Sequence, residues 1–111
     1  MSSDRRRSPR IEILGRLHGH VVAFETPVTV REISLGGMTI HTSMDLGEGT
    51  VHAFLLTLGD GSVVQLTGRI LHSRREPGSN DGPVSYVSGI RFIEDEPDAT
   101  ATVSQIIDKV R

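Results

Sequence analysis

The sequence predicts a mainly β domain, an antiparallel barrel accompanied by one helix at the carboxyl end. Apolar and polar residues alternate in several runs between residues 11 and 93, which is typical of half-buried strands. Short links containing glycine, proline or aspartate separate these runs, and no helical segment lies between them. That arrangement favours an antiparallel barrel over a parallel sheet. A helical period begins only after the last run.

The length and composition restrict the class of protein. One hundred and eleven residues make a single domain with a modest core. Cysteine is absent, which excludes a disulfide framework and a thiolate metal site. No apolar run approaches the roughly 20 residues of a membrane helix, and the basic amino terminus lacks the apolar stretch of a secretory signal. We therefore expect a cytoplasmic protein without membrane insertion.

Strands and turns follow from the local pattern. We expect strands over residues 11–18, 21–24, 28–33, 38–41, 51–58, 63–72 and 84–93. Gly19 is predicted to turn the chain between the first two runs. Residues 45–49 and 73–83 are predicted loops, and the Gly59-Asp60-Gly61-Ser62 link predicts a hairpin turn.

A helix is predicted over residues 95–111. Its apolar residues recur at helical spacing, at Ala99, Val103, Ile106, Ile107 and Val110. Asp95 and Asp98 resemble a capping box with shorter acids, and Lys109 and Arg111 suit the carboxyl end of the helix dipole. Such a helix would cover one barrel opening or a partner surface.

Charge is distributed unevenly along the chain. The net charge of −2 argues against a general nucleic-acid binder, and the three Phe, one Tyr and no Trp are few for stacking on single strands. Residues 1–10 carry +3 and the remaining residues −5. We expect a flexible, arginine-rich arm over residues 1–10, able to form a local anion site, followed by a single domain over residues 11–111.

Two stretches hold the candidate binding residues. The first comprises the arm arginines Arg5, Arg6, Arg7 and Arg10. The second is Glu32-Ile33-Ser34-Leu35-Gly36-Gly37, at a strand end that turns into the next strand. An acidic side chain, a hydroxyl and bare backbone beside arginines suit a ligand with phosphates and guanine edges. The purely structural alternatives are a turn whose glycines need positive φ and a solubilising arm.

Metal binding and catalysis are weakly indicated. His18 and His20 share a strand face, but no cysteine or carboxylate pattern completes a metal site. Ser34 is not in a nucleophile elbow, and the glycine stretch lacks a Walker A lysine. We expect a non-enzymatic protein without a metal, with a small hydrolase as the remaining catalytic alternative.

Taken together, these motifs resemble the PilZ family. Arg6-Arg7-Ser8-Pro9-Arg10 fits the Arg-x-x-x-Arg element at the amino end of that family's six-stranded antiparallel barrel. Glu32 to Gly37 fits the later Asp/Asn-x-Ser-x-x-Gly element apart from its first residue. Ser88-Gly89-Ile90-Arg91-Phe92 resembles the final strand, and the terminal helix also fits. The resemblance covers essentially the whole chain.

The resemblance implies binding of cyclic di-GMP, a bacterial second messenger, without any cofactor. Arg6 and Arg10 would pair with phosphates or guanine edges, with Arg5 and Arg7 as further arginines. A carboxylate at position 32 would accept guanine N–H groups, Ser34 would offer a hydroxyl, and Gly37 beside Gly36 would allow close approach. Closure of the arm would then signal to an unknown downstream protein.

Glu32 departs from the family pattern. Its extra methylene moves the carboxylate by roughly 1.5 Å relative to an aspartate. A misplaced charged hydrogen bond costs about 1.5–3 kcal/mol. The alternative to a receptor is therefore a degenerate module that binds protein but not cyclic di-GMP.

Overall fold

The structure is a computed structural model that describes residues 11–76, 84–93 and 99–110. Six strands and one helix make up this part of the chain. The elements are β1 (Ile11–Val21), β2 (Thr26–Ile33), β3 (Gly37–Thr42), β4 (Val51–Thr57), β5 (Val63–Glu76), β6 (Ser85–Phe92) and α1 (Ala99–Val110). The arm, and the residues expected to cap the helix, lie outside the described residues.

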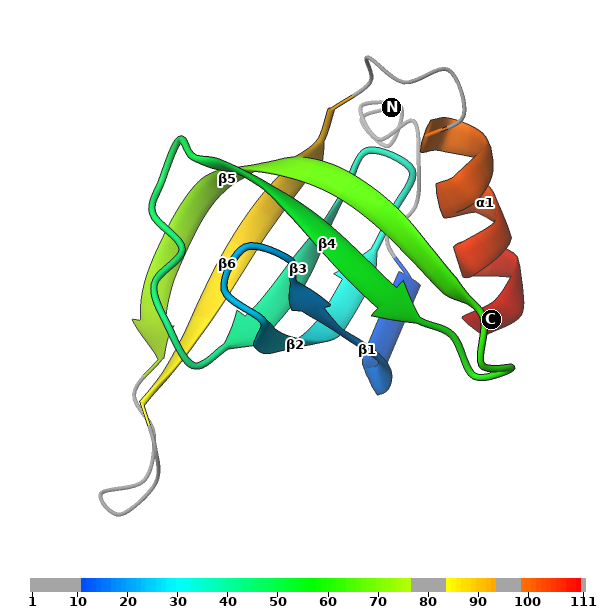
Figure 1. Cartoon of the computed structure of the whole chain (residues 1–111), viewed down its shortest axis with the longest axis horizontal. Coiled ribbons are helices and arrows are strands. Elements are labelled where there is room, and N and C mark those ends of the chain that lie inside the picture. Colours follow the sequence, from blue (N-terminus) through cyan, green and yellow to red (C-terminus); the bar gives the residue numbers. More distant parts are fainter. Residues whose placement is uncertain (1–10, 77–83, 94–98, 111) are drawn as a thin grey trace, which may run out of the picture.

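The strands form a closed barrel in the order β1-β2-β3-β6-β5-β4 (Figure 1). Every neighbouring pair is antiparallel. The predicted fold class, a six-stranded antiparallel barrel with a carboxyl-terminal helix, is therefore confirmed. The strand that follows β3 around the barrel is β6 and not β4, so strands that are distant in the sequence become neighbours.

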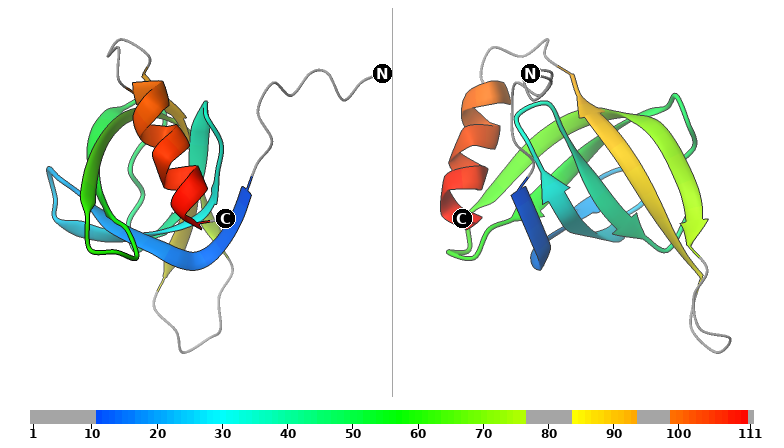
Figure 2. Two further views of the ribbon diagram at one scale, coloured as in Figure 1. Left: turned by 90° about the vertical axis from the view of Figure 1, so that its right-hand side faces the viewer. Right: turned by 180° about the vertical axis from the view of Figure 1, so that it is seen from behind.

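One core fills the barrel and continues under the helix. Its largest fully buried members come from five strands and from α1, and include Leu17, Ile33, Ile40, Phe54, Ile70 and Ile106. Figure 2 shows α1 lying across one mouth of the barrel, which is one of the two positions that the sequence left open. Burying a side chain of this size contributes about 1.5–3 kcal/mol, so the helix is a structural part of the domain.

The first turn is displaced from its predicted position. Gly19 does not turn the chain, because it lies within β1, paired with Val28 of β2 and Leu56 of β4. A Cβ added to Gly19 would meet the backbone oxygen of Leu55, so the glycine permits close packing of two strands. The chain turns instead at residues 22–25, where Glu25 adopts φ of 55° and donates its N–H to Val21 O at 2.7 Å.

Strand β5 is longer than predicted. Residues 73–76 were expected in a loop because they are polar, yet they pair with β6 from Ser73 opposite Ser88 to Glu76 opposite Ser85. Hydrogen bonds from the neighbouring strand extend β5 where its own sequence carries no alternation. The remaining part of that predicted loop, residues 77–83, lies outside the described residues.

Two β-bulges set which side chains point out of the barrel. The register of β2 against β3 shifts between Val30 and Glu32, and that of β5 against β6 shifts between Ile70 and His72. The extra residues are Arg31 and Leu71. A bulge re-aims the residues that follow it and is frequent next to functional sites.

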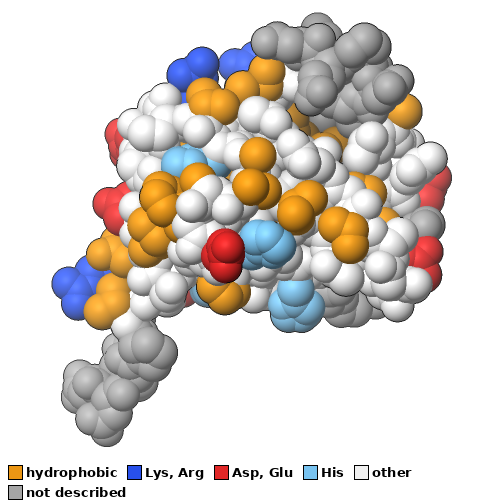
Figure 3. Space-filling view, viewed as in Figure 1, with side chains coloured by type: hydrophobic (Ala, Val, Ile, Leu, Met, Phe, Trp, Pro, Cys, Tyr) orange, Lys and Arg blue, Asp and Glu red, His pale blue; other side chains and the backbone are white. Residues whose placement is uncertain are grey.

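The outer surface is mixed in character. Figure 3 shows apolar side chains distributed among polar ones over the face formed by β4 and the β1–β2 turn. Exposed hydrophobic residues spread in this manner are normal for a folded domain. Within the described residues, no helix has both the length and the hydrophobicity required to cross a membrane.

Candidate functional site

The predicted Glu32 to Gly37 stretch forms the corner between β2 and β3. Ser34 donates its N–H to Gly37 O at 2.8 Å, and its Oγ accepts the N–H of Gly36 at 3.3 Å. Gly36 in turn accepts the N–H of Phe92 through its carbonyl at 2.9 Å, which fastens the corner to β6. The serine therefore holds the turn, with its hydroxyl at the surface beside the glycines.

The two glycines of this corner have different roles from those that the sequence suggested. Among the described residues, positive-φ glycines occur at positions 47, 49 and 61, so neither Gly36 nor Gly37 needs a left-handed conformation. A Cβ on Gly37 would lie 2.1 Å from Ile90 O, whereas one on Gly36 would meet nothing within 4 Å. Gly37 therefore permits close pairing of β3 with β6, and Gly36 leaves open surface.

A row of residues crosses four strands beside the corner. Glu32 of β2 lies opposite Thr39 of β3, Thr39 opposite Gly89 of β6, and Gly89 opposite His72 of β5. Gly89 contributes no side chain, and the imidazole of His72 lies over it, since a Cβ added to Gly89 would lie 2.3 Å from His72 Nε2. Between Glu32 and His72, the row therefore carries the side chain of Thr39 alone.

A hollow of about 210 Å³ lies along this row, on the outside of the barrel. Residues from four strands line it: Glu32, Ile33, Ser34, Gly36, Gly37, Met38, Thr39, Leu71, His72, Gly89, Ile90 and Arg91. Gly36, Gly37 and Gly89 contribute only backbone to this lining. Glu32 and Ser34 come from the end of β2 and its corner, Leu71 and His72 from β5, and Arg91 from β6.

The bulges explain why the walls carry these side chains. Glu32 lies two positions after the buried Val30, and strict alternation would point both into the core. The bulge at Arg31 turns Glu32 outward, half-buried, and returns Ile33 to the core. His72 likewise lies two positions after the buried Ile70, and the bulge at Leu71 turns His72 outward, so that Leu71 and His72 are both exposed. The result is a hollow with an acid, a hydroxyl, an imidazole, a guanidinium and an apolar edge.

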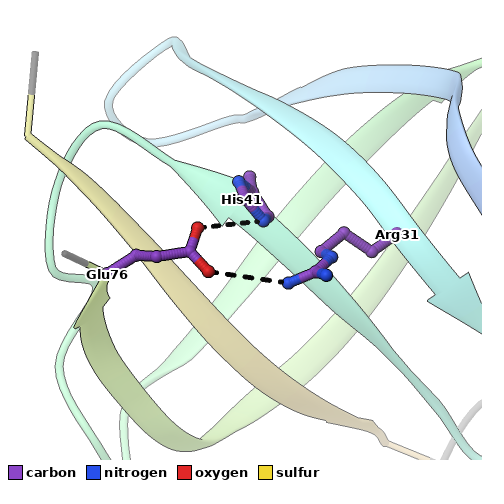
Figure 4. A network of polar contacts seen from close by, with 3 residues as sticks. All are labelled: Arg31, His41 and Glu76. Atoms are coloured by element: carbon purple, nitrogen blue, oxygen red, sulfur yellow. Dashed lines mark ion pairs between the residues drawn. The ribbon is translucent and has the colours of Figure 1, made fainter. Parts of the chain in front are cut away.

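A separate group of charges lies on the same barrel wall. Glu76 of β5 lies 3.8 Å from Arg31 Nη1 and 3.6 Å from His41 Nε2, so it connects β5 with β2 and β3 (Figure 4). These residues do not line the hollow. Arg31 therefore has an acidic neighbour, which distinguishes it from the arginine at the rim of the hollow.

The structure brings together four of the eight predicted site residues. Glu32, Ser34, Gly36 and Gly37 all line the hollow. The other four, Arg5, Arg6, Arg7 and Arg10, lie outside the described residues. The chain reaches the barrel at Ile11, which lies opposite Ile33, so the arm joins the barrel beside the corner.

Sequence reasoning missed three wall residues, Leu71, His72 and Arg91. Arg91 lies within the predicted final strand, but its position in the hollow follows from its pairing with Gly37, which is far away in sequence. His72 is the last residue of the predicted strand over residues 63–72, where nothing marked it as a site residue. The described residues contain no cluster of three or more His, Asp or Glu side chains suited to a metal ion.

Comparison with known proteins places these features in context. A PilZ domain model matches residues 4–109. The PilZ domain with c-di-GMP of YcgR from Escherichia coli superposes with a TM-score of 0.73 and 20% identity, over 96% of this chain and 91% of that chain. No curated protein matches in sequence.

Two longer structures share the fold. YcgR from Escherichia coli in complex with c-di-GMP gives a TM-score of 0.69 and 19% identity, over 94% of this chain and 45% of that chain. The K. pneumonia MrkH–c-di-GMP complex gives 0.70 and 16%, over 93% and 51%. This chain thus spans about half the length of those two proteins.

Proposed function

This chain belongs to the PilZ domain family, and we propose that it is a receptor for cyclic di-GMP rather than an enzyme. The observation that carries the proposal is the hollow itself. Its lining combines the predicted Glu32, Ser34, Gly36 and Gly37 with side chains from β5 and β6. The similar structures from Escherichia coli and K. pneumonia, which contain c-di-GMP, support the choice of ligand.

The chemistry of the lining suits a guanine dinucleotide. The Glu32 carboxylate can accept the N–H groups of a guanine edge, and the Ser34 hydroxyl can bind a polar group of the ligand. His72 presents a ring over Gly89, where a base can stack on it. Arg91 supplies a positive charge at the rim, where a phosphate can pair with its guanidinium.

The arm completes the proposed site. We assign Arg6 and Arg10 to phosphate and guanine contacts, with Arg5 and Arg7 as neighbouring positive charges. Because the arm joins β1 next to the corner, its arginines are tethered near the hollow. Ordering the arm costs conformational entropy, which its arginine contacts must offset. The change of surface on closure would signal to a downstream protein.

Calorimetric titration with cyclic di-GMP tests this function. We expect saturable heat with a micromolar or tighter Kd in the wild-type chain. Arg6→Ala and Arg10→Ala should each weaken binding by more than about tenfold, because a charged hydrogen bond contributes about 1.5–3 kcal/mol. Arg75→Ala is the matched control, since Arg75 is exposed on β5 and does not line the hollow.

The alternative function is a PilZ-like module that binds only protein. Glu32 in place of the family's Asp or Asn is the observation that favours it. Absence of both heat and a thermal shift at high cyclic di-GMP concentration would reject the receptor and leave this alternative. Equal losses in Arg6→Ala and Arg75→Ala would instead show that binding depends on overall charge.

A further inference from the structure

A second hollow lies next to the candidate nucleotide site. It has a volume of about 280 Å³ and is lined by Arg69, Leu71, Arg91, Phe92 and Ile93. Leu71 and Arg91 line both hollows, whereas Arg69 lines only the second one. The two depressions are therefore adjacent on the outer surface of β5 and β6, with a shared wall.

The charges of this second hollow are unusual. Arg69 and Arg91 lie directly opposite each other on neighbouring strands, with both side chains exposed. Like charges in this arrangement repel each other and destabilise a sheet. Arg69 donates from Nη1 to Gly49 O at 3.1 Å, but within the described part of the chain neither arginine forms an ion pair.

Arg69 and Arg91 differ in this respect from Arg31. Arg31, also on the outer wall, has Glu76 as its acidic neighbour. The second hollow thus holds two facing guanidinium groups without a carboxylate from the described residues. It also carries an apolar edge, because Leu71 is 52% exposed although it lies in the middle of a strand.

We propose that this second hollow is a docking site for an acidic segment of a partner protein that also carries an aliphatic side chain. Carboxylates of the segment would pair with Arg69 and Arg91 and relieve their repulsion. An aliphatic side chain would pack against Leu71 and Ile93. Charge complementarity favours this occupant over a basic or purely apolar one.

Because Leu71 and Arg91 line both hollows, docking of the acidic segment should affect binding of the nucleotide. This coupling, unlike the docking itself, rests on the proposed function. A nucleotide phosphate at Arg91 would compete with the carboxylates of the acidic segment for the same guanidinium. Cyclic di-GMP should therefore weaken docking, and by reciprocity the acidic segment should weaken nucleotide binding. The ligand would act by releasing its partner.

Fluorescence anisotropy with the full chain tests the proposal. The probe is a short fluorescein-labelled peptide of alternating glutamate and leucine, and the control probe replaces glutamate with lysine. We expect binding of the acidic probe only. Arg69→Glu should weaken that binding by about tenfold, or about 1.4 kcal/mol, because it converts an attraction into a repulsion.

Matched variants test whether the change in affinity for the acidic probe arises at Arg69. Arg75→Glu makes the same charge change elsewhere on β5 and should alter the affinity of the acidic probe by less than about twofold. Arg69→Glu should remain folded, since it places an acid opposite Arg91. Arg69→Ala, which removes the charge without adding an acid beside Arg91, should keep its calorimetric affinity for cyclic di-GMP. Saturating cyclic di-GMP should weaken binding of the acidic probe to the wild-type chain.

Several results would overturn the docking site. These are no binding of the acidic probe, an unaltered affinity in Arg69→Glu, or equal weakening in Arg75→Glu. A loss of nucleotide stoichiometry in Arg69→Ala would also overturn it, by identifying the hollow as a further nucleotide subsite. If cyclic di-GMP does not bind but the probe still depends on Arg69, the receptor function fails and the docking site stands.

Discussion

At the scale of single residues, the hollow is defined as much by missing side chains as by present ones. Gly37 and Gly89 lie where a Cβ would meet the Ile90 carbonyl and the His72 ring. The first obstacle is backbone, which cannot move without disturbing the β3–β6 pairing. The second is the end of an exposed side chain, which can rotate. The hollow thus combines one rigid glycine with one replaceable glycine.

Substituting the two corner glycines tests which of them the pairing of β3 with β6 requires. Gly37→Ala should lower the free energy of unfolding by about 1–3 kcal/mol, the usual cost of overpacking, because its Cβ would lie 2.1 Å from Ile90 O. Gly36→Ala, with no atom within 4 Å of its Cβ, should leave stability within about 0.5 kcal/mol of wild type. Urea unfolding measures both. Equal effects would show that the close approach of β3 and β6 is not what requires glycine at position 37.

The sequence identified one side of the hollow and missed the other. Glu32, Ser34, Gly36 and Gly37 are contiguous, so a motif can reveal them together. Leu71, His72 and Arg91 join them only through the pairing of β6 with β3 and β5, which depends on the closed barrel. Long-range pairing of this kind leaves no local signal, apart from glycine in the final strand.

The length of the side chain at position 32 gives a second residue-scale prediction. Glu32→Asp should tighten cyclic di-GMP binding, by about tenfold if the shorter acid restores a hydrogen bond worth about 1.4 kcal/mol. Calorimetry against Glu32→Gln, which keeps the length and removes the charge, provides the control. Weaker binding of the aspartate variant would mean that the hollow is adapted to glutamate.

At the scale of elements, the bulges and the helix determine what each strand presents. The bulges at Arg31 and Leu71 direct Glu32 and His72 to the surface, and neither bulge could be predicted from a two-residue period. The helix, by contrast, was predictable from its apolar spacing. Sequence periodicity therefore identifies an element and its buried face, whereas irregularities within a strand depend on its neighbours.

The contribution of the helix to stability can be measured with a matched pair. Ile106 of α1 is 0% exposed and belongs to the barrel core, so Ile106→Ala should lower the free energy of unfolding by about 2–5 kcal/mol. Gln105→Ala, on the exposed side of the same helix, should change it by less than about 0.5 kcal/mol. If Ile106→Ala proved neutral in chemical denaturation, the helix would not be part of the folded core.

At the scale of the whole molecule, barrel closure creates the site. The chain order separates β2 and β3 from β5 and β6, and the strand order β2-β3-β6-β5 brings them into one wall. Alternation in the sequence was sufficient to predict a barrel, because burial on one face imposes a period of two. The order of strands around the barrel was not predicted, because no local pattern in the sequence shows which strands pair.

Ligand binding should be visible in the stability of the entire domain. A ligand that binds only the folded state at a concentration of about 100 times its Kd stabilises that state by about 2.7 kcal/mol. For a domain of about 100 residues, this corresponds to a rise in Tm of roughly 10 °C or more. We therefore expect a concentration-dependent rise of this size with cyclic di-GMP in differential scanning fluorimetry.

Arm variants determine whether that stabilisation requires both halves of the proposed site. Arg10→Ala should keep the Tm of the ligand-free protein, since it removes a ligand contact, and should lose most of the ligand-dependent rise. Arg75→Ala should keep both values. GTP, which has a guanine and phosphates but is not a cyclic dinucleotide, should give a much smaller rise. An equal rise with GTP, or an undiminished rise in Arg10→Ala, would contradict joint recognition of the dinucleotide by arm and hollow.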